Sequence, residues 1–378
     1  MSIKILFLNT CHFSYDDRVF YHQAESLSNY DHEIMIVSTK ENIIKNEGNI
    51  SINSFDARNL TIRERKIKIL EYLTIFAPEI IICDSPLAVI SANSYRKIKK
   101  SEIIYDITEW YPSKKNLRNL YFLKKTGKFA FLILVNLYAG LISDKFIFGE
   151  YHKSIPFRKL FFWKQSLILP YYPNLKFIQR YDINRIDREI KLFYSGNIST
   201  EKGIDSIINS IDKVSKLFPQ TFFHLRIIGQ FPTKIEEQNF KNITSELNSN
   251  VEIHIDNFMP FRDYCNEIGK SDLFFDLRQI DIENTHCLPI KLFYYLACGK
   301  PIIYSNLKSI RKGIENINFG FLTDPNNSIK IASFISDYIN NPDLYKEHAR
   351  NALLESHNKY NWKKIENSFI SFLATEKQ

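Results

Sequence analysis

The segment 288–303 constrains the fold of this chain more than any other stretch of the sequence. Its apolar residues first recur at helical spacing and then form a short β-branched run. Pro289 suits the first turn of a helix, where its missing N–H is not needed. Gly299 stands where a helix end favours a left-handed residue, and Pro301 follows it closely. The segment therefore predicts a helix, a tight turn and a buried strand.

The rest of the chain alternates in the same way. The predicted strands are 3–9, 33–38, 79–83, 102–106, 145–148, 191–194, 222–228, 251–255 and 273–276. The predicted helices are 17–28, 62–76, 87–99, 128–142, 203–218, 235–247, 261–270 and 328–340. Such alternation indicates parallel βαβ units. We therefore predict an α/β protein with parallel sheets and helices on both faces of each sheet.

Prolines at 170 and 173 and the charged residues that follow interrupt this alternation, which indicates a linker between two domains. A length of 378 residues also suits two cores better than one. We place one domain over residues 1–173 and the second over 174–359. Two doubly wound domains would hold a ligand at the carboxyl ends of their strands.

Composition disfavours several other classes. The five cysteines are scattered, without CxxC spacing, and the histidines do not pair with them at zinc-ligand spacing, so we expect no metal. No glycine-rich motif follows the strand 3–9, which disfavours a dinucleotide oxidoreductase. The first residues lack the pattern of a secretory signal, so we expect a cytoplasmic protein.

The segment 288–303 resembles the donor-site signature of group 1, or family 4, glycosyltransferases, which have two facing Rossmann-like domains. Their pattern is Pro-x-Lys-x-x-Glu-Tyr-x-Ala-x-Gly-x-Pro-Val-Ile. It is matched at Pro289, Lys291, Tyr295, Ala297, Gly299, Pro301 and Ile303. The resemblance implies the GT-B fold, a nucleotide-sugar substrate, no cofactor, and a last helix within 360–378 that crosses back to the N-terminal domain.

The loop Gly196–Gly203 resembles the family loop that gives an Arg and a Lys to the donor diphosphate. Lys202 matches the Lys, whereas Asn197 replaces the Arg. A departing diphosphate gains charge that must be stabilised, and a lysine with backbone N–H groups does this without a metal. Lys291 is expected to compensate for the missing Arg. Alternatively, residues 199–201 cap the helix that follows.

Other donor-side positions follow from the same resemblance. Gly229 ends a strand as in the family's Ile-Gly-x-Gly. Phe258 lies in the loop beside the nucleotide base, where it either stacks on the base or belongs to the core. Leu288 and Pro289 begin the signature helix, whose N-terminus is expected to bind an anion.

The acidic pair of the family falls on His286 and Tyr294. In the family the first Glu contacts the donor sugar and the second holds the ribose. Tyr294 can hydrogen-bond a ribose as a neutral group, His286 can bind a hydroxyl or a carboxylate, and Glu283 is a candidate replacement acid. The departure implies an unusual donor, such as an acidic or deoxy sugar, or a loss of activity.

On the acceptor side, Asp17 and Arg18 resemble the family's Asp-x-Arg-Val segment. Asp106 and Glu109 lie in a segment that resembles Asp-x-His-Glu, with Thr108 in place of the His, and are the candidate polar contacts near the transfer point. The alternatives are a helix cap at Asp17 and a surface ion pair at Arg18.

Residues 114–164 contain eleven Lys or Arg and two acidic residues, a net charge of +9 in a chain of net charge +8. Aromatic residues are interleaved with these cations, which suits an anionic membrane surface. The apolar run 129–141 is too short to span a bilayer, and its alternative interpretation is a buried helix. A nucleic acid is disfavoured because no recognition motif accompanies the patch.

Taken together, we predict a metal-independent glycosyltransferase. It would move a sugar from a nucleotide sugar, UDP-linked by preference, to a glycan or lipid-linked acceptor in bacterial capsule or lipopolysaccharide synthesis. It would be cytoplasmic and peripheral at the inner face of the membrane. Two alternatives are a non-catalytic partner subunit and a nucleotide-sugar epimerase on the same fold.

Overall fold

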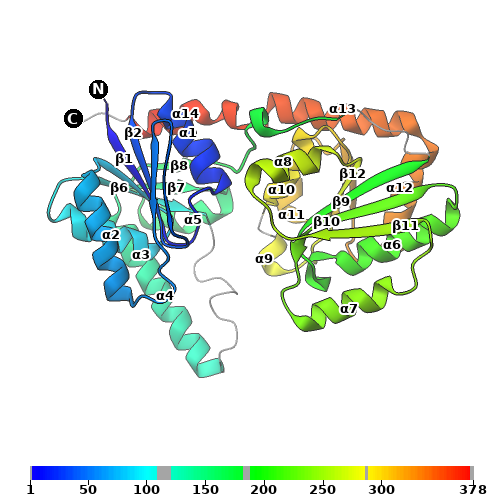
Figure 1. Cartoon of the computed structure of the whole chain (residues 1–378), viewed down its shortest axis with the longest axis horizontal. Coiled ribbons are helices and arrows are strands. Elements are labelled where there is room, and N and C mark those ends of the chain that lie inside the picture. The colour runs from blue at the N-terminus through cyan, green and yellow to red at the C-terminus, as the bar shows by residue number, and fades with distance from the viewer. Residues whose placement is uncertain (1, 109–120, 182–187, 286–287, 375–378) are drawn as a thin grey trace. The chain divides into compact units, whose positions relative to one another are not determined.

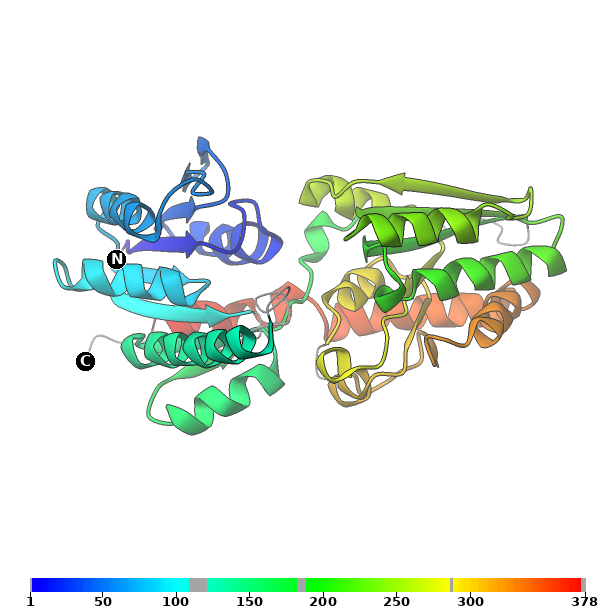
Figure 2. The same ribbon diagram turned by 90° about the horizontal axis from the view of Figure 1, so that it is seen from below.

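A computed structural model of the chain describes residues 2–108, 121–181, 188–285 and 288–374. The chain forms two compact units (Figures 1 and 2). Unit 1 comprises residues 1–171 and 365–378, and unit 2 comprises 172–364. The boundaries predicted from the sequence lay after residues 173 and 359. Each unit has one sheet with helices packed against it, as the alternating pattern predicts.

Unit 1 has an eight-stranded sheet in the order β3-β4-β2-β1-β5-β6-β7-β8. Its strands are β1 (Lys4–Asn9), β2 (Glu33–Ser38), β3 (Ile43–Glu47), β4 (Ile50–Ser54), β5 (Ile80–Cys83), β6 (Glu102–Ile107), β7 (Lys145–Phe148) and β8 (Ser166–Ile168). All neighbours pair in parallel except β3 and β4, which are antiparallel. Strands β3, β4 and β8 were not predicted, because an edge hairpin with polar exposed positions and a three-residue strand give no apolar run in the sequence.

The helices of unit 1 are η1 (Asp17–Ala24), α1 (Glu25–Ser28), α2 (Ile62–Phe76), α3 (Pro86–Arg96), α4 (Phe122–Ile142), α5 (Tyr151–Leu160) and α14 (Glu366–Leu373). The single helix predicted over 17–28 is in fact a π-helix followed by one α-helical turn. Asp16 is its N-cap, accepting hydrogen bonds from two backbone amides, so the capping role suggested for Asp17 belongs to its neighbour.

Helix α4 is longer and more exposed than the sequence analysis predicted. It begins at Phe122, and Figure 1 shows its amino-terminal part projecting beyond the rest of unit 1. In the described part of the chain, Lys124–Ile142 is a helix long and apolar enough to cross a membrane by length and composition, and 22% of it is buried. The buried-helix interpretation of 129–141 is therefore wrong, and this run is part of a longer helix than the sequence analysis predicted.

The C-terminal segment of the chain belongs to unit 1, where it forms α14. The Lys145 ammonium group lies 5.4 Å from the ring centroid of Phe372 and donates to the Phe372 carbonyl at 3.3 Å. Lys145 also forms an ion pair of 2.8 Å with Glu102. These contacts tie the last helix to the amino ends of β6 and β7.

Unit 2 has a six-stranded, fully parallel sheet in the order β11-β10-β9-β12-β13-β14. Its strands are β9 (Glu189–Asn197), β10 (Phe222–Gln230), β11 (Val251–Asp256), β12 (Leu273–Asp276), β13 (Ile302–Ser305) and β14 (Gly320–Thr323). Its helices are η3 (Leu175–Phe177), η4 (Thr200–Lys202), α6 (Ile204–Leu217), α7 (Lys234–Thr244), α8 (Phe261–Gly269), α9 (Ile282–Thr285), α10 (Ile290–Ala297), α11 (Lys308–Gly313), α12 (Ser328–Asn340), α13 (Pro342–Asn358) and η5 (Trp362–Lys364).

The signature segment folds as its sequence predicts. Pro289 is the N-cap of α10, Gly299 has a φ of +69°, and β13 follows directly. Helix α10 is buried from Leu292 to Ala297, so it packs into the core on nearly every side.

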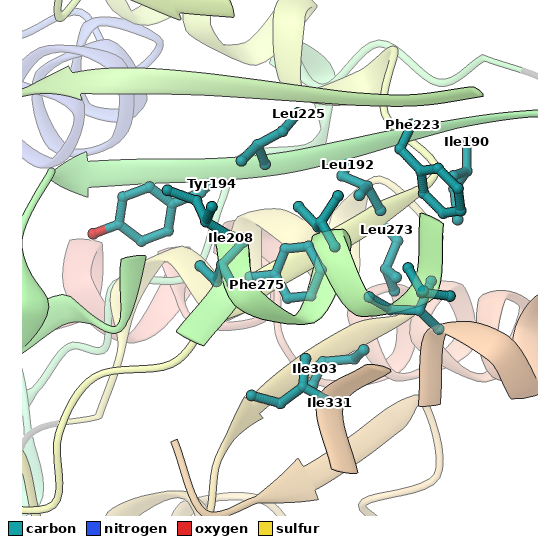
Figure 3. Packing of buried hydrophobic residues seen from close by; sticks show 14 of the residues in the cluster. Ile190, Leu192, Tyr194, Ile208, Phe223, Leu225, Leu273, Phe275, Ile303 and Ile331 are labelled. Atoms are coloured by element: carbon teal, nitrogen blue, oxygen red, sulfur yellow. The ribbon is translucent and has the colours of Figure 1, made fainter. Parts of the chain in front are cut away.

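One large core cluster of unit 2 lies between the sheet and helices α6 and α12 (Figure 3), and another contains α10. Alternate residues of β9, including Ile190, Leu192 and Tyr194, point into it. Figure 3 shows Tyr194 at one end of the cluster, with its hydroxyl group pointing away from the apolar side chains. The strand thus carries an aromatic residue from the core to the edge of the sheet where β9 ends.

Candidate functional site

The carboxyl ends of β9, β10 and β12 meet at one edge of unit 2, because these strands are parallel neighbours. At this edge Gly196 pairs with Gly229 across β9 and β10. Gly196 has a φ of +130°, and a Cβ atom on it would overlap the Nζ atom of Lys291. The backbone conformation at 196 therefore favours glycine, and a side chain there would displace the lysine ammonium group.

Lys291 reaches from the first turn of α10 to the end of β9. Its Nζ atom donates to the Ser195 carbonyl and lies 5.7 Å from the ring centroid of Tyr194. The Tyr194 hydroxyl in turn donates to the Asn197 carbonyl at 2.7 Å. Two side chains from the interior of the unit thus hold the backbone of the loop that the sequence analysis had singled out.

The charge on Lys291 is destabilised by its surroundings. Burial, with smaller contributions from the nearby charges of Arg278 and Lys202, lowers the pKa of Lys291 to about 8 against the opposing effect of Asp276. Three cations from three different segments therefore influence one another at this edge. A cluster of like charges is unfavourable by itself and becomes favourable when an anion binds among them.

Arg278 is a site residue that the sequence analysis missed. It follows β12, and its Nε and Nη2 atoms donate to the two oxygens of Asp276, each at 2.8 Å. Its backbone is fixed as well: the Ser305 hydroxyl donates to the Arg278 carbonyl at 2.7 Å, and the Gln279 amide donates to the Glu201 carbonyl at 2.9 Å. The available signal was a charged pair directly after a buried strand, where α/β proteins place their ligands.

Lys202 lies on η4, against the segment that carries Arg278. Its Nζ atom forms an ion pair of 3.0 Å with Glu201, and its side chain is partly exposed. Gly203 has a φ of +79°, and a Cβ atom there would overlap the Leu277 carbonyl. Gly203 is also the N-cap of α6, without a side-chain cap, so the alternative that residues 199–201 cap this helix is wrong.

The other donor-side candidates are placed differently. Tyr294 is 4% exposed, and its ring packs against those of Phe261 and Tyr264 in the aromatic core. Phe258 is 54% exposed, so its alternative interpretation as a core residue is wrong. Leu288 is partly buried and Pro289 buried at the start of α10. The roles assigned to these residues, and to Gly229 and Asn197, stay predictions.

Three candidates cannot be placed. Glu109 and His286 lie outside the described residues, and the Glu283 side chain does too, although its backbone belongs to α9. The acid that would replace the family's first Glu therefore stays a prediction.

In unit 1, Asp106 and Arg18 form a buried pair. The Arg18 Nε and Nη2 atoms donate to the Asp106 carboxylate, both at 2.9 Å, and its Nη1 atom donates to the Leu169 carbonyl at 2.8 Å. Gln23 donates to Asp106 at 3.0 Å, and the guanidinium lies 4.6 Å from the ring centroid of Tyr171. Burial alone would lower the pKa of Arg18, but the Asp106 carboxylate raises it.

This geometry gives both residues a structural task. Arg18 is 3% and Asp106 4% exposed, so the alternative of a surface ion pair at Arg18 is wrong. The pair joins the π-helix to the carboxyl ends of β6 and β8 within unit 1. Asp17 is partly exposed and accepts a hydrogen bond from the Arg18 amide at 2.9 Å.

A second polar cluster in unit 1 was not predicted. Asp84 follows β5 and accepts hydrogen bonds from the backbone amides of Thr10, Cys11 and His12 at 2.8–3.1 Å. The Nδ1 atom of His12 lies 3.0 Å from the same carboxylate, and this carboxylate is nearly buried whereas the imidazole is partly exposed. A carboxylate that orients an imidazole is an arrangement that general bases use. The loop after β1 thus places a histidine at the carboxyl edge of its sheet.

No group of three His, Cys, Asp or Glu side chains suited to a metal ion comes together within the described ranges. The expected metal independence stays a prediction.

Comparison with known proteins relates most of unit 2 to a family. Residues 176–354 match the family profile described as glycosyl transferases group 1. An uncharacterized glycosyltransferase from Haemophilus influenzae is 26% identical over 151 residues, which is 40% of this chain and 39% of that relative. The match thus spans less than half the length of this curated relative.

Solved structures match the whole chain. Sucrose-phosphate synthase from Thermosynechococcus elongatus aligns over 98% of both chains with 13% identity and a TM-score of 0.70. HepE from Anabaena, crystallised with UDP-glucose, aligns over 99% of this chain and 100% of its own, with 14% identity and a TM-score of 0.70. Such identities establish the fold, which is that of the GT-B glycosyltransferases.

Proposed function

Residues 176–354 of this chain belong to the group 1 glycosyl transferases, and from this we propose that the whole chain is a glycosyltransferase with a nucleotide-sugar donor. The observation that carries the proposal is the cluster of Lys202, Arg278 and Lys291 at the carboxyl edge of the unit 2 sheet. Its charges suit a diphosphate, the group that a nucleotide-sugar donor releases.

The main chemical requirement of the proposed reaction is to stabilise the diphosphate leaving group. Cleavage of the bond between the sugar and the diphosphate leaves charge on the phosphate oxygens, and fixed cations lower the energy of that state. Lys291 is held in place by the Ser195 carbonyl before any donor arrives, so little reorganisation is needed. We favour a UDP-linked donor, because the similar HepE structure contains UDP-glucose.

For the acceptor, we propose that His12 removes the hydroxyl proton during transfer, with Asp84 holding the imidazole in position. This assigns to His12 the polar contact that the sequence analysis sought at Asp106. Asp106 is engaged with Arg18 and Gln23 instead.

The test of donor binding is ligand-induced thermal stabilisation of the purified protein. A panel of UDP-, GDP-, dTDP- and CMP-sugars is compared for wild type, Lys202→Ala and Lys216→Ala. A ligand that binds the folded state raises the melting temperature by mass action. We expect a shift with one nucleotide class, reduced in Lys202→Ala. Lys216→Ala is the matched control, because Lys216 pairs with Asp212 on the outer face of α6 and should leave the shift unchanged.

The alternative of a non-catalytic partner subunit rests on Tyr294, which is buried in the aromatic core at the position expected to hold the ribose. If no nucleotide sugar shifts the melting temperature of the wild type, this alternative replaces the proposed activity. An epimerase would bind the donor and convert it without an acceptor, so product analysis after incubation with the donor alone separates the two activities.

We further propose that the acceptor is a glycan or lipid-linked saccharide in the synthesis of bacterial capsule or lipopolysaccharide, and that the protein is cytoplasmic and docks on the inner face of the membrane. Support comes from one face of α4, formed by Phe131, Leu134, Tyr138 and Leu141, whose exposed fractions lie between 48% and 65%. Spacings of three and four residues put these side chains in one stripe. Soluble proteins rarely leave such a stripe uncovered.

Cations and further aromatic residues frame the α4 face. Lys124, Lys125 and Lys128 are exposed on the first turns of α4. Beyond the other end, Phe162 and Trp163 are 80% and 59% exposed. Anionic lipids attract such lysines by about 1 kcal/mol each, while aromatic rings enter the headgroup region.

Vesicle co-sedimentation tests this docking surface. We expect binding to vesicles enriched in phosphatidylglycerol and little binding to phosphatidylcholine alone. The double variant Phe131→Ser/Leu134→Ser should lose binding, whereas Leu354→Ser, which removes a half-exposed leucine from α13, should retain it. Equal binding by all three proteins would exclude the α4 face as the docking surface.

A further inference from the structure

Arg278 stands in for the cation that the loop after β9 lacks. This inference rests on the proposed function and deepens it. The family loop carries an Arg where this chain has Asn197, so a diphosphate bound here would lose one of its expected partners. We propose that Arg278 supplies the missing guanidinium from the neighbouring strand, and that the Asp276–Arg278 pair is the element that recognises the donor diphosphate.

The fold places Arg278 beside the loop that begins at Asn197. Strands β9 and β12 pair in parallel, with Leu192 opposite Leu273 and Phe193 opposite Phe274. Beyond these pairs the segment that follows β12 runs along the loop that follows β9, where the Leu277 carbonyl lies against Gly203 and the Gln279 amide donates to the Glu201 carbonyl at 2.9 Å. The guanidinium of Arg278 can therefore contact the same ligand group that an arginine at position 197 would contact.

Local contacts confine Arg278 to this place. Its backbone carbonyl accepts a hydrogen bond from Ser305, and the next amide donates to Glu201, on the loop that carries Lys202. The guanidinium is bound through two of its nitrogens by Asp276, and its side chain is 14% exposed. A guanidinium held in this way has a fixed orientation, which suits the bidentate recognition of phosphate oxygens.

Asp276 also explains how a cluster of cations is tolerated without a ligand. Its carboxylate is buried and acts on both Arg278 and Lys291. It offsets part of the repulsion among the three cations while the site holds no anion. When a diphosphate binds, the guanidinium can bridge Asp276 and the phosphate, because it has five N–H donors.

The test compares Arg278→Gln with the double variant Asn197→Arg/Arg278→Gln. Binding of UDP, GDP, UMP, GMP and inorganic pyrophosphate is measured by calorimetry. We expect Arg278→Gln to weaken the nucleoside diphosphate that binds wild type, and pyrophosphate, by roughly 10- to 100-fold, with a smaller effect on the monophosphate. Returning an arginine to position 197 should restore diphosphate affinity to within a few-fold of wild type.

The recovery of affinity in the double variant distinguishes a phosphate-binding role of Arg278 from a purely structural one. If Arg278 merely stabilised the fold through Asp276, an arginine at 197 would not restore binding, and that result would overturn the inference. Equal diphosphate affinity of wild type and Arg278→Gln would overturn it too. Should Arg278→Gln fail to fold, Asp276→Asn/Arg278→Gln removes both charges of the pair, and the same comparison is made in that background. If wild type binds no nucleotide, the proposed function itself fails, which is distinguishable from these outcomes.

Discussion

The ammonium group of Lys291 occupies the space where a side chain on Gly196 would begin. One residue lies at the start of a buried helix and the other near the end of a strand almost a hundred positions earlier in the sequence. The glycine leaves room for the lysine, and the lysine donates to the carbonyl of the preceding residue, Ser195. This relationship joins the two motifs that the sequence analysis could relate only by family spacing.

The first prediction concerns pH. Burial lowers the pKa of Lys291 to about 8, so the cation is lost as pH rises through 8. We expect donor affinity, measured by calorimetry, to fall between pH 7 and 9.

The folding stability of the protein without donor should change with pH in the opposite direction. Between pH 8 and the ordinary lysine pKa the unfolded chain binds more protons, so the free energy of unfolding rises with pH. In Lys291→Met the pH dependence of donor affinity and that of the free energy of unfolding should both disappear. If donor affinity falls equally with pH in wild type and in Lys291→Met, another group is responsible for the pH effect.

The second prediction concerns Gly196→Ala. The φ of +130° and the overlap with Lys291 should lower the free energy of unfolding by about 1–3 kcal/mol and displace the lysine, with loss of donor-induced stabilisation. Thermal melts with and without the donor measure both effects. Gly127→Ala is the control: it lies on α4 with open space around it, so we expect a gain of roughly 0.5–1 kcal/mol. A Gly196→Ala protein with normal stability and donor binding would contradict the geometry described for Lys291.

The third prediction separates structure from catalysis at Asp106. Asp106→Ala leaves the Arg18 guanidinium buried without its carboxylate, so unfolding in urea should show a loss of about 3–5 kcal/mol. Replacing both residues, as Arg18→Met/Asp106→Leu, should recover much of that loss. If Asp106 instead contacts the reacting sugar, the double variant would fold well and yet be inactive with donor and acceptor supplied.

The fourth prediction concerns His12. His12→Asn keeps a polar side chain beside Asp84 but removes the base, so transfer to the acceptor should slow by about 100-fold or more, while donor-induced stabilisation stays as in wild type. Steady-state rates across pH, with melting curves for the same samples, measure both. An unchanged rate would remove His12 from the mechanism, and a parallel loss of donor binding would assign it a structural role.

The sequence alone was sufficient for the broad architecture. Apolar segments such as Glu33–Ser38 and Ile62–Phe76 form the predicted elements with the predicted bounds. A strand that is buried on both faces leaves a continuous apolar run in the sequence, and a helix that is buried on one face leaves a helical repeat. The glycine and prolines around α10 likewise fix its ends by local backbone preference. Such local rules need no knowledge of distant residues.

Tertiary structure decided what each polar residue does. Arg18 and Asp106 were predicted from the sequence to contact the acceptor, but they form an ion pair within unit 1. Arg278 was not predicted as a site residue, because only the pairing of β12 with β9 brings it to the site. Likewise, α4 has the composition of a core helix, yet the fold leaves one of its faces uncovered. Charge pairing and exposure depend on which segments the fold brings together, and a one-dimensional pattern records the residue types without recording their neighbours.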